Sequence, residues 1–128
     1  MSLFEQLRRR ASEIPKLSQL SPDDIQDLKN CFPGLPEDYL LFLEQIGYGC
    51  LDGLQVYSGP IAPDDIYSKF RGDPANVILF GDDTQGYCFG FDTSQAFALV
   101  EVDPKGTPHA LEESSFLSLM AVYLLDEP

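Results

Sequence analysis

Three aspartates flank two short apolar stretches, and their spacing is the first in the chain to suggest chemistry. Asp82 and Asp83 follow the stretch 76–80, and Asp92 follows the stretch 87–91. A hairpin joining the two stretches could bring the three carboxylates together, as a metal site or a glycosidase acid–base pair requires. The segment 82–86, however, lacks the regular oxygen spacing of known calcium loops, and its Asp and Gly residues are typical of a turn. We therefore favour a turn and keep a carboxylate-based metal-binding enzyme as the alternative.

Other residues capable of catalysis lack the partners that they would need. The one histidine, His109, stands in a Pro-His-Ala stretch after a turn, which is typical of a surface residue. No serine or cysteine has an evident paired base, and no glycine-rich segment continues into the Lys-Ser or Lys-Thr of a phosphate loop. The sequence predicts a protein that is not an enzyme, with no catalytic residue, no cofactor and no metal site.

The cysteines and the N-terminal stretch bear on the compartment. Cys31, Cys50 and Cys88 are odd in number and widely spaced, which favours neither a disulfide framework nor a zinc ribbon. Their neighbours are apolar or aromatic, so we expect buried free thiols in a reducing compartment. The N-terminal stretch carries no apolar run, so we expect neither a secretory signal nor a membrane span. The predicted localisation is cytoplasmic.

Charge limits the class of partner. The 128 residues contain 8 Lys and Arg against 21 Asp and Glu, giving a formal net charge of −13. Residues 1–30 are balanced, with five bases and five acids, so the whole excess belongs to residues 31–128, with three bases against 16 acids. Phosphate backbones and anionic membrane surfaces repel such a chain, which excludes nucleic acid and membrane as partners. The obvious complement is a basic protein.

Acids in the expected loops, together with nearby tyrosines, are the candidate binding residues. Carboxylates on loops steer a basic partner, and tyrosines supply contact area with few rotatable bonds. The alternative to a binding role is that the acids keep the protein soluble and that some of the tyrosines belong to the core. The predicted partner-binding residues are Asp52, Tyr57, Asp64, Asp65, Asp82, Asp83 and Tyr87.

Periodicity predicts helices first, strands next and one helix last. Apolar residues at helical spacing predict helices over 3–14, 22–32 and 36–46, with Ser21 as a cap and Pro22 and Pro36 in first turns. From residue 54 the period changes to two, which predicts three or four strands joined by short turns and hence hairpins. Ser114 or Ser115 caps a last helix. We expect one α+β domain over residues 1–128: a curved, mainly antiparallel sheet with N-terminal helices and a C-terminal helix packed on it.

Three of these segments resemble motifs of the SUKH superfamily. The segment 35–47 begins Leu-Pro-Glu-Asp-Tyr and leads on to Leu54, as does the opening helix of that family. The segment 78–92, Ile-Leu-Phe-Gly-Asp-Asp-Thr-Gln-Gly-Tyr-Cys-Phe-Gly-Phe-Asp, is similar to its paired strands around a Gly-Asp turn. Ser115-Phe116-Leu117 resembles the start of its last helix. The match covers about residues 25–125. It departs from the family at Ile46, where Asn is frequent, at Tyr87, where Asp is frequent, and in having no Trp.

The resemblance implies an α+β fold and a protein without enzymatic activity. Bacterial members of the family are mostly immunity proteins that neutralise polymorphic toxins, often nucleases, and fungal members regulate cell-wall synthesis. An acidic surface suits the first role, because a nuclease cleft must be basic to hold phosphate. The leading hypothesis is an immunity protein whose acidic loops and aromatic residues occlude the basic cleft of a toxin. A regulatory scaffold like the fungal members stays open beside it, and the sequence leaves the toxin and the oligomeric state undetermined.

Overall fold

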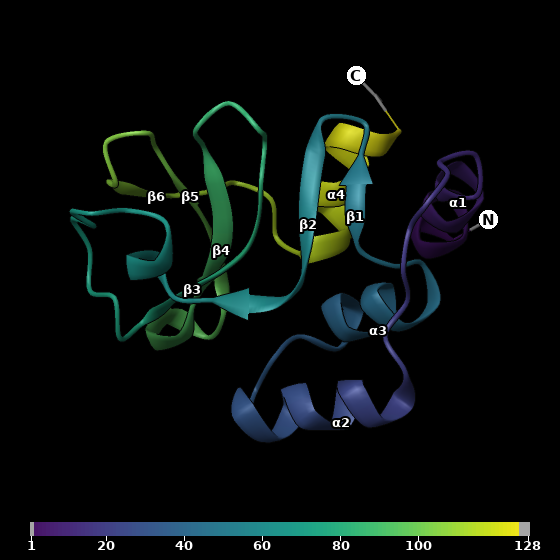
Figure 1. Cartoon of the computed structure of the whole chain (residues 1–128), viewed down its shortest axis with the longest axis horizontal. Helices are drawn as coiled ribbons and strands as arrows, with labels where there is room; N and C mark the ends of the chain where they lie inside the picture. Colours follow the sequence, from purple (N-terminus) through teal and green to yellow (C-terminus); the bar gives the residue numbers. More distant parts are fainter. Residues whose placement is uncertain (1, 126–128) are drawn as a thin grey trace.

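A meander of six antiparallel strands organises the chain (Figure 1). The computed structural model describes residues 2–125. Each strand pairs with the next along the chain, in the order β1 to β6, and the ladder is not closed. The strands are β1 Gly49–Leu51, β2 Leu54–Ile61, β3 Val77–Asp82, β4 Cys88–Asp92, β5 Ala98–Val102 and β6 Pro108–Ala110. The expected α+β domain with a mainly antiparallel sheet is confirmed.

The helices precede and follow the sheet, and local sequence sets their ends. They are α1 Leu3–Ala11, α2 Pro22–Cys31, α3 Glu37–Gln45 and α4 Phe116–Leu124. Ser21 and Asp24 form a reciprocal capping box on α2, and Ser115 caps α4, as predicted. Gly47 follows α3 at φ 127°, where a Cβ would lie 2.5 Å from the carbonyl oxygen of Ser18. Within residues 2–125, no helix is long and apolar enough to cross a membrane.

Several boundaries differ from the expectation for local reasons. The first helix ends at Ala11 and not at Ile14, because the chain turns at Ser12 before it reaches Pro15. Strands β1 and β6 have three residues each, too few to show a period of two. Gly59 and Pro60 are residue types that predict a loop, but they belong to β2. Proline is accepted there because β1 pairs only with residues 54–56, so the rest of β2 is an edge on that side.

The main core is an aromatic cluster between the helices and one face of the sheet. The ring of Tyr39 on α3 lies 5.8 Å from Phe80 of β3, 5.4 Å from Phe91 of β4 and 5.0 Å from Phe116 of α4. The last two contacts are edge-to-face, a favourable geometry for aromatic pairs. Beside the cluster, the backbone amide of Leu117 donates to a carboxylate oxygen of Asp38 at 3.2 Å. These contacts join α3, the β3–β4 hairpin and α4.

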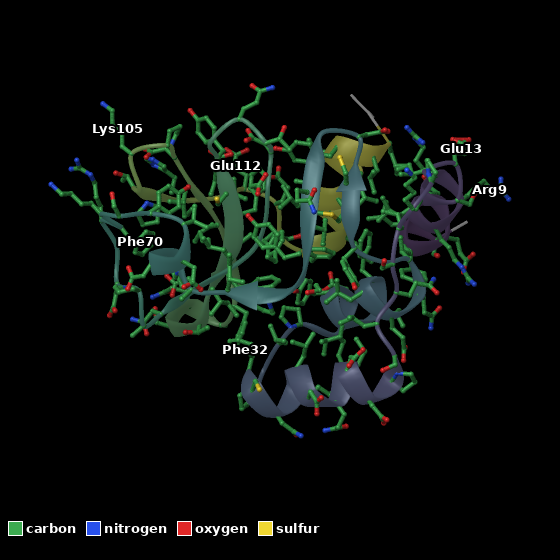
Figure 2. All side chains as sticks on the ribbon, viewed as in Figure 1. Arg9, Glu13, Phe32, Phe70, Lys105 and Glu112 are labelled. Atoms are coloured by element: carbon green, nitrogen blue, oxygen red, sulfur yellow. The ribbon has the colours of Figure 1, made fainter. Side chains whose placement is uncertain are left out.

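The other face of the sheet is covered by residues 62–75, which we call the strap. The strap begins with the short 3₁₀ helix η1, Pro63–Asp65, and its side chains Tyr67 and Phe70 pack on a smaller apolar cluster. That cluster contains Val77, Leu79, Cys88, Val100 and Val102. The strap and α1 mark opposite ends of the molecule, as the labelled Phe70 and Arg9 show (Figure 2).

The expectation of three buried thiols is wrong for two of them. Cys88 on β4 is buried under the strap, whereas Cys31 and Cys50 are exposed. Cys31 ends α2 and Cys50 lies on the edge strand β1. The apolar residues next to these two cysteines in the sequence do not make them buried. The end of a helix and one face of an edge strand remain open to water.

The hydroxyl of Tyr39 leads to a first prediction. It is buried and has no hydrogen-bond partner within residues 2–125, and burial raises the pKa of this phenol far above its usual value. An unpaired buried hydroxyl destabilises the folded state because it loses its hydrogen bonds to water. We expect Tyr39→Phe to keep the aromatic contacts and to raise the free energy of unfolding by about 1 kcal/mol in urea denaturation. A lower free energy of unfolding would mean that the hydroxyl has a partner in solution.

Candidate functional site

Every second turn of the meander lies at the same end of the sheet, which we call the turn end. The register pairs Gln55 with Asp82 and Cys88 with Val102. The β1–β2, β3–β4 and β5–β6 turns therefore lie at the same end, and Figure 1 shows the first two of them at the top of the view. Most of the predicted binding residues are on or beside these turns. Asp64 and Asp65 are the exceptions, since both are exposed on η1 in the strap.

The predicted acid of the β1–β2 turn has a partner inside the chain. Asp52 accepts a hydrogen bond from the guanidinium of Arg10, which also pairs with Glu13 at 3.3 Å. Asp52 sits in the left-handed region at φ 50° and is followed by Gly53 at φ 88°. Its charge is thus compensated by α1, which weakens its pull on an external basic group.

Asp82 belongs to a polar cluster on the strap side of the sheet. The hydroxyl of Tyr57 donates to one carboxylate oxygen of Asp82 at 2.5 Å, and the amide of Thr84 donates to the other at 2.8 Å. Burial, and then this bond to Asp82, raise the pKa of Tyr57 well above its usual value. The hydroxyl of Tyr67 donates to the carbonyl of Val102 at 3.2 Å, and burial raises the pKa of the neighbouring Cys88 thiol. Two predicted residues, Tyr57 and Asp82, therefore meet.

Asp83 closes the β3–β4 turn through bonds to the backbone of that turn. Its Oδ1 accepts from the amides of Gln85 at 2.8 Å and of Tyr87 at 3.1 Å, which makes the expected turn. Burial first, and then the charges of Asp83, Glu101 and Glu113, raise the pKa of Tyr123 on α4. The two consecutive acids therefore have different partners: Asp82 binds the Tyr57 hydroxyl, whereas Asp83 binds amides of its own turn, and, after burial, its charge raises the pKa of Cys88 as well as that of Tyr123.

Three residues that the sequence did not single out complete an acidic surface here. Glu101 is opposite Phe89 in the β4–β5 register, so both side chains point to the helix side, where Phe89 lies 5.5 Å from Tyr123. Tyr87 precedes Phe89 by two residues, so its side chain lies on the same side of the sheet, and it is 38% exposed. The signal in the sequence was Glu101, an acid in an otherwise apolar strand. We call the following group the Tyr123 surface: Asp83, Tyr87, Glu101, Glu113 and Tyr123.

The carboxylate metal site of the alternative hypothesis does not form. Asp92 pairs with Val77 at the start of β3, whereas Asp82 is at its end, so the strand length separates them. At about 3.4 Å per residue, this is well beyond the reach of one metal ion. Asp92 instead accepts from the amide and hydroxyl of Ser94 at 3.0 and 2.6 Å. Within residues 2–125, no group of three His, Cys, Asp or Glu side chains could hold a metal ion.

The histidine lies on strand β6 and bonds to the turn before it. His109 Nε2 lies 2.9 Å from Asp103 Oδ2, and the other oxygen of Asp103 accepts from the amides of Lys105 and Thr107 at 2.9 and 3.0 Å. The bond to His109, and then the amide of Thr107, lower the pKa of Asp103. The imidazole is exposed, as the sequence predicts, and it stabilises the carboxylate that closes the β5–β6 turn.

Comparisons with protein-family models, with curated proteins and with solved structures found no match for the chain. Any function must therefore be argued from the fold and from the surfaces described above.

The Tyr57–Asp82 bond predicts a change opposite in sign to that of Tyr39→Phe. Tyr57→Phe removes the same atom, but it leaves the half-buried carboxylate of Asp82 with one donor fewer. Bonds to charged groups stabilise by about 1.5–3 kcal/mol, and we expect a loss at the lower end of that range because the site is partly open to water. Urea denaturation of the two variants side by side gives the comparison. Equal effects would show that the Tyr57 hydroxyl does not bind Asp82 in solution.

The Asp103 turn predicts a pH dependence. A carboxylate whose folded pKa lies below its ordinary value of 3.8 adds stability above that pH, and this contribution is lost as the pH falls through the folded pKa. We expect His109→Ala to raise the pKa of Asp103 toward 3.8 but not to reach it, because the amides of Thr107 and Lys105 still donate. Carboxyl carbon NMR titration measures the midpoint. An unchanged midpoint in the variant would contradict the assigned role of His109.

Proposed function

We propose that this protein is a non-enzymatic binding protein of the immunity class, which neutralises a bacterial toxin domain in the cytoplasm. The observation that carries the proposal is the Tyr123 surface. Its three acids, Asp83, Glu101 and Glu113, come from a turn, a strand and the approach to α4, and after burial their charges raise the pKa of Tyr123. The ring of Tyr123 lies 5.5 Å from that of Phe89, the residue opposite Glu101 in the sheet. None of the three acids forms an ion pair with a base of residues 2–125. Carboxylates that are not paired with a base of their own chain are available to a basic partner.

The three segments that resemble the family in sequence also contact one another in the structure, and these contacts support the family resemblance on which the immunity class rests. The three resembling segments meet: Tyr39 of the first touches Phe80 and Phe91 of the second and Phe116 of the third. Asp38 of the first accepts from the amide of Leu117 of the third. Residues that define a family in sequence are often those that hold its elements together. This arrangement is what a SUKH-like domain would need.

The proposed mechanism is occlusion of a basic cleft. A nuclease binds phosphate with basic side chains, and three carboxylates on one surface imitate that charge. Tyr87 and Tyr123 add apolar area that is rigid enough to anchor a contact. Of the residues predicted from the sequence, Asp83 and Tyr87 belong to this surface. Asp82 and Tyr57 bond to each other beside the same turn, and the charge of Asp52 is compensated by Arg10.

Co-expression with a toxin encoded beside the gene tests the proposal. We expect the wild-type protein to restore growth, and Glu101→Gln combined with Glu113→Gln to lower toxin affinity about tenfold, mainly through slower association at low salt. Glu5→Gln combined with Asp27→Asn changes the net charge equally on exposed parts of α1 and α2 and serves as the matched control. Surface plasmon resonance separates the association and dissociation rates.

Two outcomes would contradict the proposal. If no toxin gene is adjacent, or if co-expression does not restore growth, the immunity function fails. If both double variants weaken binding to the same extent, net charge and not the Tyr123 surface governs the interaction.

A further inference from the structure

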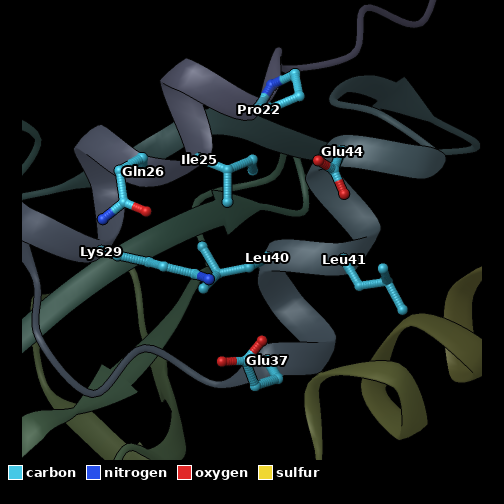
Figure 3. Close-up of a pocket in the computed structure, with 8 residues that line it drawn as sticks. All are labelled: Pro22, Ile25, Gln26, Lys29, Glu37, Leu40, Leu41 and Glu44. Carbon is cyan, nitrogen blue, oxygen red and sulfur yellow. The ribbon is translucent and has the colours of Figure 1, made fainter.

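A groove of about 240 Å³ opens between α2 and α3 (Figure 3). Figure 1 shows these two helices on the side of the molecule away from the turn end. Ile25 of α2 and Leu40 of α3 form the floor of the groove and are 8% and 3% exposed. Leu41 of α3 lies at its margin and is 38% exposed, one of the few large apolar side chains left open to water. The remaining lining residues are Pro22, Gln26, Lys29, Glu37 and Glu44. The groove therefore combines an apolar floor with a charged rim.

The acids of the rim follow one stripe of α3. Glu37, Leu41 and Glu44 are spaced by four and then three residues, so they lie on one face of the helix. At 1.5 Å per residue, the two glutamates are about 10 Å apart along the axis, with the leucine between them. Neither glutamate forms an ion pair with another described residue. A carboxylate, an apolar contact and a second carboxylate thus repeat at the period of an α-helix.

We propose that this groove binds a basic amphipathic helix of a partner protein. Such a helix presents an apolar side chain between two Lys or Arg residues one heptad apart, which matches the stripe of α3 in spacing and in sign. The apolar side chain fills the space above Ile25 and Leu40, and the two bases meet Glu37 and Glu44. Charge selects against other helices, because a chain with a net charge of −13 repels an acidic one.

Lys29 gives the proposal a second signature. Figure 3 shows its side chain extended from α2 across the groove toward α3. A basic helix that enters must displace this ammonium group, because like charges at close range repel. Removing the charge of Lys29 should therefore tighten binding. Removing any base from the surface should raise the affinity for a basic helix to some extent. The informative quantity is therefore how much more the affinity rises when Lys29 is removed than when a distant lysine is removed.

The inference does not rest on the proposed immunity function. The groove lies on α2 and α3, whereas the Tyr123 surface lies on the β3–β4 turn, β5 and α4. Either surface can be altered without touching the other. Loss of toxin rescue with an intact groove contradicts the immunity function alone, and loss of helix binding with intact rescue contradicts the groove alone.

The test uses the full chain and a labelled synthetic helix of about 15 residues, long enough to be partly helical in water. The peptide carries two lysines one heptad apart with a leucine between them, and a scrambled peptide of the same composition is the control. Fluorescence anisotropy at low salt should give micromolar binding for the ordered peptide. Glu37→Gln combined with Glu44→Gln should weaken it at least tenfold, and Leu41→Asp should abolish it.

Matched variants decide the interpretation. Glu5→Gln combined with Asp27→Asn removes the same number of charges outside the groove and outside the Tyr123 surface, and should alter peptide affinity less than twofold. Lys29→Ala should tighten binding several-fold more than Lys105→Ala does. Circular dichroism melting checks that each variant is folded.

Three results would overturn the proposal. If the scrambled peptide binds as well as the ordered one, net charge alone determines the affinity. The same conclusion follows if the two double variants weaken binding equally. In sedimentation velocity, a concentration-dependent dimer that Glu37→Gln with Glu44→Gln dissolves would identify a second copy of the chain as the occupant. Absence of groove-dependent binding at millimolar peptide would also reject the groove as a helix site.

Discussion

The contact of Tyr39 with three phenylalanines from separate parts of the chain is the interaction on which the arrangement of the molecule depends. Phe80 and Phe91 belong to adjacent strands and Phe116 to the last helix, so one ring on α3 fixes the positions of all three elements. Phe80 also contacts Phe91 and Phe116 directly, at 4.9 and 5.0 Å. Because protein interiors are close-packed, these rings leave little freedom for α4 to shift on the sheet. Both proposed binding surfaces involve helices held by this cluster.

Much of the fold was predictable because local and tertiary signals agree. The capping residues Ser21 and Ser115 mark helix starts in the sequence and in the structure. The short connections between apolar runs correctly indicated an antiparallel sheet. The bounds of β2 were not predictable in the same way, since Pro60 is acceptable only because β1 is too short to reach it. That information lies in the partner strand and not in the residue itself.

The candidate site was less predictable, because composition does not say which side of the sheet a residue takes. Asp82 and Asp83 are neighbours in the sequence, yet one bonds the hydroxyl of Tyr57 on the strap side and the other bonds amides of its own turn. Asp52 looked free but meets Arg10, 42 residues away. Conversely, Glu101 and Glu113 gained their significance only from the fold, because the tyrosine whose pKa both charges raise, Tyr123, belongs to another element, α4. Pairings at long sequence separation decided each case.

The lengths of the outer strands have a consequence for the kind of contact the protein can make. The outer strands β1 and β6 have only three residues each, and the part of β2 that β1 leaves uncovered contains Pro60, which has no amide to donate. An exposed edge invites another chain to extend the ladder through its unpaired amides and carbonyls, and short edges offer few of these groups. Recognition by strand addition, and the uncontrolled sheet growth that begins fibrils, are therefore both disfavoured. Partners must be recognised through side chains on the helices and turns, where sequence can change without disturbing the ladder.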